Sequence, residues 1–108
     1  MTDILSIENI EDHYAEVSHT LVEANELVSG ERKIQYGDFI KNHEDIAKVW
    51  SVITGIKLDA HQVLLMMSSL KIVRASKPDS YLHDNYVDAA AYLSMANAFK
   101  KTKDNIHE

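Results

Sequence analysis

The spacing of apolar residues, at helical intervals and with few interruptions, most constrains how this chain can fold. The chain has three Gly and one Pro, and each lies between segments in which apolar residues recur every three or four positions. No segment shows the alternation typical of a strand. Four segments of helix length remain, at about 6–29, 38–54, 59–75 and 84–101. A chain of 108 residues has the length of one domain, and short loops favour an all-α, antiparallel four-helix bundle over residues 1–108.

The apolar positions also predict how these helices pack. Segment 6–29 carries a narrow seam made of Ile7, Ile10, Tyr14, Val17, Leu21, Ala24 and Val28. Such a seam packs against other helices. Segment 59–75 is apolar on nearly all sides, which predicts a central helix, and Asp59 and Gln62 at its start have the spacing of a capping box. A single small bundle has a limited core in which to bury these faces, so we expect a homo-oligomer, a dimer at least.

Composition excludes several classes of protein. Eleven Lys and Arg against seventeen Asp and Glu give a net charge of -6, which argues against general binding of DNA or RNA. The chain has no Cys, which excludes disulfides and thiolate-bound zinc. The longest strictly apolar run, residues 63–67, is far shorter than the roughly 20 residues that span a bilayer. We expect a protein of the bacterial cytoplasm without a signal peptide or membrane segment.

Three of the predicted helices turn polar toward what should be one end of an antiparallel bundle. The polar positions are Asp38, Asn42 and Asp45 at the start of segment 38–54, Lys71 and Arg74 at the end of segment 59–75, and Asp84 and Asp88 at the start of segment 84–101. Lys71 and Arg74 offer two donors for a phosphate. Asp84 and Asp88, one helical turn apart, offer oxygen ligands for a divalent ion. Together they suit a magnesium nucleotide.

Structural interpretations of the same residues remain open at this point. Asp84 and Asp38 stand where helix N-caps are expected. Lys71 and Arg74 are also placed to form ion pairs with the aspartates of segment 84–101, in which case the polar end is part of the scaffold. We expect His43 to be packed in the core beside apolar neighbours. His83 is either a surface residue or, because of the residues around it, a ligand contact.

A set of short motifs resembles a phage and prophage family of unknown function. The motifs are residues 24–32, Tyr36-Gly-Asp38, Asn42, Ile46-Ala47, Trp50, Leu65-Met66-Met67, Leu70-Lys71-Ile72, Arg74, and an Asp-Asn-x-x-Asp motif followed by Tyr at Asp84-Asn85, Asp88 and Tyr92. The similarity extends over about residues 21–96, and the paired Tyr-Gly-Asp and Asp-Asn-x-x-Asp signatures make it fairly specific.

That family in turn resembles the MazG-type nucleoside triphosphate pyrophosphohydrolases. The resemblance implies an oligomeric helical bundle that binds Mg²⁺ through carboxylates and splits an NTP into NMP and pyrophosphate. The MazG pattern is Glu-x-x-Glu on one helix and Glu-x-x-Asp on the next. This chain departs from it with Asn42-x-x-Asp45 and Asp59-x-x-Gln62, each of which has an amide in place of a carboxylate.

Two functions follow as hypotheses. In the first, the protein is a phosphohydrolase of NTPs or dNTPs in which Asp84 and Asp88 hold Mg²⁺ or Mn²⁺, with Asp45 or Asp38 as a further ligand or base. Lys71 and Arg74 then stabilise charge on the phosphates. The residues expected to contact the nucleotide are Arg32, Tyr36, Asn42, His83 and Asn85, with Tyr36 or Trp50 stacking on the base.

In the second hypothesis the same pocket binds without catalysis. The protein then sequesters a nucleotide, or inhibits a host protein by binding it. A purely structural role, with the polar end as an ion-pair network, is the third interpretation.

Overall fold

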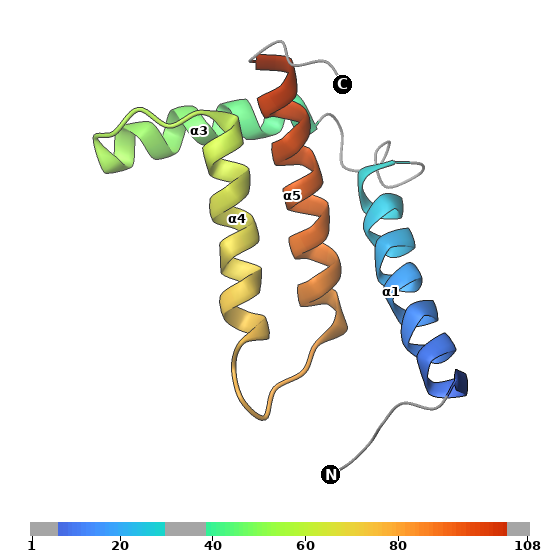
Figure 1. The fold of residues 1–108 in the computed structure, drawn as a ribbon. Helices are drawn as coiled ribbons and strands as arrows, with labels where there is room; N and C mark the ends of the chain where they lie inside the picture. The colour runs from blue at the N-terminus through green and yellow to red at the C-terminus, as the bar shows by residue number, and fades with distance from the viewer. Residues whose placement is uncertain (1–6, 30–38, 104–108) are drawn as a thin grey trace.

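A computed structural model describes residues 7–29 and 39–103 of the chain. This part contains α1 (Ile7–Val28), α3 (Phe39–Thr54), α4 (Ala60–Ala75) and α5 (His83–Lys103), and no strand (Figure 1). Over the described residues, the prediction of an all-α chain with four helices is confirmed, and each helix boundary lies within two residues of the predicted one. Among the described helices, none has the length and apolar content that crossing a bilayer requires.

Local sequence signals set two of these boundaries. At the start of α4, the Asp59 carboxylate accepts a hydrogen bond from the Gln62 backbone N–H, and the Gln62 side chain accepts one from the Asp59 backbone N–H, both at 2.9 Å. The predicted capping box is therefore confirmed. At the end of α3, Gly55 adopts a left-handed φ of 72°, a conformation that terminates helices and that glycine adopts without strain.

Helices α4 and α5 form an antiparallel hairpin, which is the most extensive contact among the described helices. Val63 and Leu64 of α4 are completely buried. The Ser68 hydroxyl, also buried, donates a hydrogen bond to the Ala89 carbonyl of α5 at 3.1 Å. Ala89 and the buried Ala96 lie seven residues apart on one face of α5, and small side chains of this kind allow two helices to approach closely.

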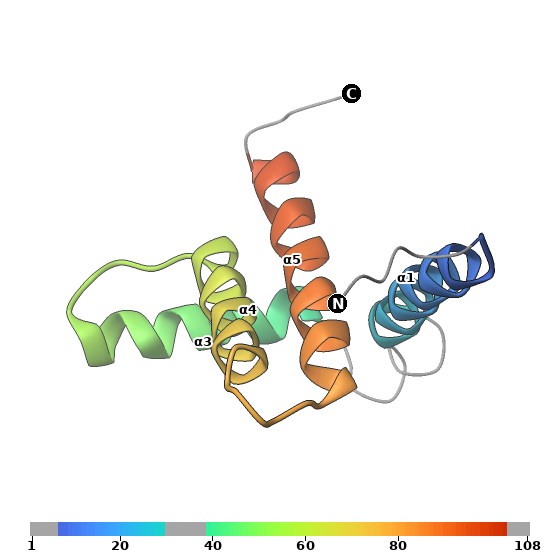
Figure 2. The ribbon, with the colours of Figure 1, turned by 60° about the horizontal axis from the view of Figure 1, so that its bottom comes forward.

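Helix α1 lies on the other side of α5 and contacts it only through its C-terminal half. Ala24 forms a small core with Val87 and Ala91 of α5, flanked by Leu27 and Val28. The remaining part of the predicted seam is exposed, namely Ile10, Tyr14, Val17 and Leu21. Figures 1 and 2 together show that α1 crosses α5 obliquely, so its N-terminal half extends away from the hairpin.

Helix α3 lies across the end of the hairpin formed by the start of α4 and the end of α5 (Figure 1). The Phe39 ring contacts Phe99 edge-on with centroids 5.8 Å apart, and His43 contacts Tyr92 in the same way at 6.3 Å. His43 is buried, as predicted. The expectation that α3 begins near the start of α5 is wrong, because these aromatic contacts hold the start of α3 against the stretch of α5 from Tyr92 to Phe99.

Helix α4 is less central than its apolar composition predicts. One face is buried in the hairpin, but the other apolar side chains are exposed. These are Leu65, Met66, Leu70, Ile72 and Val73. An apolar helix is buried all round only where neighbours surround it, and α4 has α5 along one side and α3 across one end.

Candidate functional site

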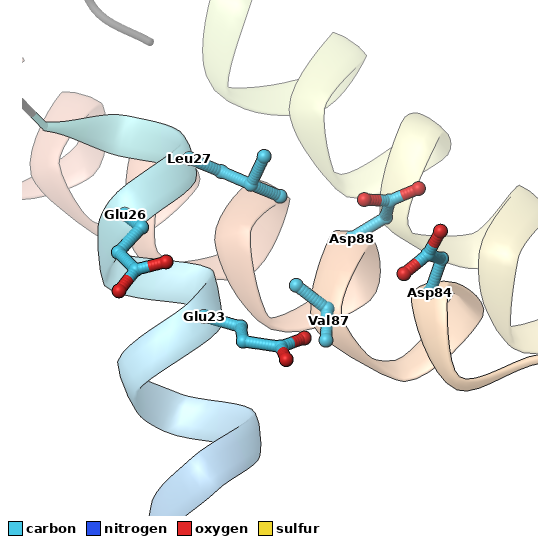
Figure 3. A pocket seen from close by; sticks show the side chains of 6 residues that line it. All are labelled: Glu23, Glu26, Leu27, Asp84, Val87 and Asp88. Carbon is cyan, nitrogen blue, oxygen red and sulfur yellow. The ribbon is translucent and has the colours of Figure 1, made fainter. Parts of the chain in front are cut away.

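An acidic pocket lies between α1 and α5. It has a volume of about 300 Å³, and four carboxylates line it together with two apolar side chains: Glu23, Glu26, Asp84, Asp88, Leu27 and Val87 (Figure 3). Its lining, among the residues that the structure describes, contains no Lys or Arg. Carboxylates that face one cavity repel one another unless a cation lies between them. The pocket therefore has the charge of a cation site.

The helix register explains how these side chains come together. Glu23 and Glu26 are three residues apart on α1, and Asp84 and Asp88 are four residues apart in the first turns of α5, so each pair shares one helix face. Figure 3 shows Glu23 and Leu27 extending from α1 toward Val87, next to the two aspartates. The small core around Ala24 holds the two faces at this separation.

One cation lies beside the pocket without lining it. The Lys71 ammonium Nζ of α4 is 3.0 Å from the Asp88 Oδ2, and both side chains are mostly buried. The pair confirms that the end of α4 meets the start of α5, as the polar pattern predicted. Lys71 thus fixes the position of Asp88, whereas Arg74, one turn further along α4, is exposed.

His83, the first residue of α5, is bound to the same α1 face. Its Nε2 is 2.8 Å from Glu23 Oε2, and Nε2 of His19 is 2.8 Å from Glu23 Oε1. Both oxygens of one pocket carboxylate are therefore held by imidazoles. Asn85, two residues further on, is buried within the first turn of α5.

The predicted site residues of α3 do not line this pocket. Asp45 forms an exposed ion pair with Lys41 one turn earlier, at 2.8 Å. The hydrogen bond from Lys41 lowers the pKa of the Asp45 carboxyl below its ordinary value of 3.8. Asn42 is exposed on the same helix, and Trp50 is half-buried. The predicted positions Arg32, Tyr36 and Asp38 lie outside the described residues.

Comparison with known proteins identifies the family. A family model described as a domain of unknown function, DUF6378, matches residues 19–100. The chain belongs to the DUF6378 family. It is also 34% identical over 85 residues to the Gene 55 protein of Mycobacterium phage L5, an alignment that covers 78% of this chain and 54% of the phage protein. The chain thus spans about half the length of that relative. No solved structure matches this chain.

The DUF6378 match and the phage relative together confirm the resemblance to a phage family of unknown function. The matched residues 19–100 include all four carboxylates of the acidic pocket and the Lys71 that holds Asp88. The site therefore lies within the DUF6378 domain.

Sequence reasoning missed half of the pocket of this DUF6378 member. Glu23 and Glu26 have the Glu-x-x-Glu spacing of the MazG pattern, whereas the sequence comparison places that pattern on segments 38–54 and 59–75. Asp59 and Gln62 of the second segment are instead engaged in the capping box. The signal that identifies the glutamates is their spacing on a predicted helix, three residues apart on either side of the seam residue Ala24.

Proposed function

We propose that this protein is a Mg²⁺-dependent nucleotide phosphohydrolase of the MazG type, which splits an NTP or dNTP into the monophosphate and pyrophosphate. With a relative encoded by a mycobacteriophage, the proposed setting is the cytoplasm of the bacterial host. The observation that carries the proposal is the acidic pocket, to which α1 contributes Glu23 and Glu26 and α5 contributes Asp84 and Asp88.

The donor set of the pocket fits Mg²⁺ or Mn²⁺. Both ions prefer carboxylate and water oxygens, and Mg²⁺ is usually held by a few carboxylates together with substrate phosphates. The residues that would hold the ion are Glu23, Glu26, Asp84 and Asp88. Their carboxylates line one pocket, but in the structure no three of them bring an oxygen within 4.8 Å of one another, so these side chains would have to turn toward the ion as it binds. A bound ion would polarise a phosphoryl oxygen and bring the phosphate chain to the carboxylates.

The basic residues of α4 have different parts in this proposal. Lys71 orients Asp88 through their 3.0 Å ion pair. Arg74 is exposed, and its guanidinium suits bidentate contact with a phosphate. The resemblance to MazG enzymes supports the same assignment, because Glu23-x-x-Glu26 has the required spacing. The second pair, Asp84-x-x-x-Asp88, departs from Glu-x-x-Asp by one residue.

Turnover of a nucleotide panel tests the proposal. The purified protein is incubated with Mg²⁺ or Mn²⁺ and each NTP and dNTP, and pyrophosphate and monophosphate are measured. Asp84→Asn and Glu26→Gln each remove one exposed carboxylate of the pocket, and we expect activity to fall by at least about 10–100-fold. Glu11→Gln, an exposed glutamate elsewhere on α1, is the matched control and should retain full activity. No turnover by the wild type at high protein concentration contradicts the proposal.

The second candidate function is nucleotide binding without hydrolysis. The observation that favours it is the engagement of Asp59 and Gln62 in a capping box, which leaves α4 without the carboxylates of an active MazG enzyme. Thermal melting with and without nucleotides separates the two functions. Stabilisation without turnover indicates a binding or sequestering protein. If nucleotides are not hydrolysed and do not stabilise the protein, a host protein is the expected partner.

The proposal includes assembly as a homo-oligomer. The radius of gyration is 16.9 Å, whereas a compact domain of this length has about 13 Å. The α1 seam is exposed at Tyr14 and Leu21, at 67% and 60%. An apolar seam of this kind buries its surface when it packs against a second helix.

Light scattering of paired variants tests the assembly. Leu21→Glu places a charge on the seam, and we expect it to shift the mass toward that of a monomer. Val22→Glu alters the next residue, which is similarly exposed but off the seam, and should leave the mass unchanged. A monomer mass for the wild type at tens of micromolar contradicts the proposed assembly.

A further inference from the structure

Three side chains from α1 and α5 meet at the edge of the acidic pocket. They are His19 and Glu23, one turn apart on α1, and His83 at the start of α5, and we refer to them as the His–Glu–His cluster. The two Nε2 atoms are each 2.8 Å from one oxygen of Glu23, and the three ligand atoms all lie within 4.8 Å of one another. The side chains of Glu23 and His83 are about 30% exposed, and that of His19 is more exposed.

Both rings of the cluster already direct Nε2 at the Glu23 carboxylate. The imidazoles of His19 and His83 stack with their planes 19° apart and their centroids at 5.8 Å. Nδ1 of His83 lies 3.4 Å from the Tyr81 hydroxyl. Metal-binding histidines commonly direct their second ring nitrogen to such a polar partner, which fixes the ring and the tautomer. With Nε2 bound to a metal, Nδ1–H of His83 donates to the Tyr81 oxygen.

The donor set of the cluster differs from that of the pocket beside it. Two imidazole nitrogens and one carboxylate oxygen are a ligand set that Zn²⁺ adopts with water in the fourth position. Mg²⁺ prefers oxygen ligands alone. Ligands about 2.0–2.1 Å from a tetrahedral Zn²⁺ are roughly 3.3 Å apart. The two histidine nitrogens are each 2.8 Å from a different oxygen of Glu23, and the three ligand atoms lie within 4.8 Å of one another, so modest side-chain movements bring them to this spacing.

We infer that His19, Glu23 and His83 form a binding site for a divalent transition-metal ion, Zn²⁺, which ties α1 to the start of α5. The inference does not rest on the proposed hydrolase function, because it needs no nucleotide. Only Glu23 is common to the two sites. A bound ion replaces the two imidazole–carboxylate contacts by three metal–ligand bonds and thereby strengthens the junction of the two helices.

Metal-dependent melting of the chelator-stripped protein tests the site. Zn²⁺ at tens of micromolar should raise the Tm by about 5 °C or more, while the same concentration of Mg²⁺ should produce a much smaller shift. Calorimetric titration should give one Zn²⁺ per chain. His83→Ala should abolish the Zn²⁺-dependent shift and weaken binding by at least about tenfold.

Matched histidine variants keep the test decisive. His19→Ala removes a largely exposed ring from α1, so it should leave the apo Tm almost unchanged while abolishing the Zn²⁺ shift, even if His83→Ala folds poorly. His13→Ala on α1 and His61→Ala on α4 remove histidines outside the cluster and should retain the full shift. The inference is overturned if Zn²⁺ leaves the wild-type Tm unchanged. It is also overturned if the shift survives in His19→Ala, or if it is lost in His61→Ala.

Discussion

Helix α5 packs against α4 on one side and against α1 on the other, and the two contacts differ in what fills them. Toward α4, the Ser68–Ala89 hydrogen bond joins the two helices, and Val63, Leu64 and Ser68 of α4 are buried. Toward α1, a small core around Ala24 is bordered by a pocket with four carboxylates. The first contact has the composition of a core, and the second has that of a binding site.

The two contacts should respond differently to substitution, one through stability and the other through binding. Burial of apolar side chains dominates folding free energy, so the α4–α5 contact should carry most of it. Clustered carboxylates contribute little to folding in the absence of a cation. The exposed pocket carboxylates Glu26 and Asp84 should therefore tolerate substitution in the absence of a ligand.

The largest effect is expected at Leu64. Leu64→Ala leaves a cavity in the hairpin and should lower the free energy of unfolding by about 2–5 kcal/mol, as measured by denaturant titration. Leu65→Ala is the control, because the side chain of Leu65, the next residue, is 41% exposed. This substitution should lower the free energy of unfolding by about 1 kcal/mol or less. Equal losses in the two variants contradict the assignment of the hairpin as the core.

A smaller effect is expected at Asp88, which takes part in both contacts. Asp88→Asn breaks the ion pair with Lys71 and should cost about 1–2 kcal/mol, between the values for exposed and buried pairs. Asp84→Asn, one turn earlier and exposed, should change stability by no more than about 0.5 kcal/mol. Chemical denaturation of both apo variants measures the difference. If Asp88→Asn leaves the free energy of unfolding unchanged, Lys71 and Asp88 do not stabilise each other in solution.

Hydrogen exchange compares the two contacts directly. Because α1 is held by a small core, it should unfold locally and expose its amides to exchange while the α4–α5 hairpin stays folded. We expect the central amides of α1 to exchange at least about tenfold faster than those of α4 near Leu64, which corresponds to about 1.4 kcal/mol. Equal protection of α1 and α4 in native-state exchange contradicts the comparison.

The smallest effect is expected at the exposed Lys41–Asp45 pair of α3, outside both contacts. The hydrogen bond from Lys41 lowers the pKa of Asp45 from its ordinary 3.8. Its stabilising contribution is therefore present above about pH 3.8 and is lost as the pH falls through the lowered pKa. A carboxyl NMR titration should place the Asp45 midpoint below 3.8, and Lys41→Met should return it toward that value. A midpoint that does not respond to Lys41→Met contradicts the pairing.

Sequence reasoning succeeded where the relevant contacts lie within one element or at a turn. The Asp59–Gln62 capping box and the Gly55 stop are such signals, and both are present. The spacing of Asp84 and Asp88 likewise identified one wall of the pocket. The other wall depends on the rotation of α1 about its own axis, which is set by contact with residues some sixty positions away, as at Glu23 and His83. Nothing in the local pattern of α1 specifies that partner.

The same separation along the chain has a consequence for the order of folding. The Ser68–Ala89 contact closes a loop of 21 residues, whereas the Glu23–His83 contact closes one of 60. The longer closure costs roughly 1 kcal/mol more in chain entropy. The α1–α5 contact also buries less apolar surface with which to offset that cost. We therefore expect the α4–α5 hairpin to form first and α1 to dock last, so that the acidic pocket is completed only in the final step of folding.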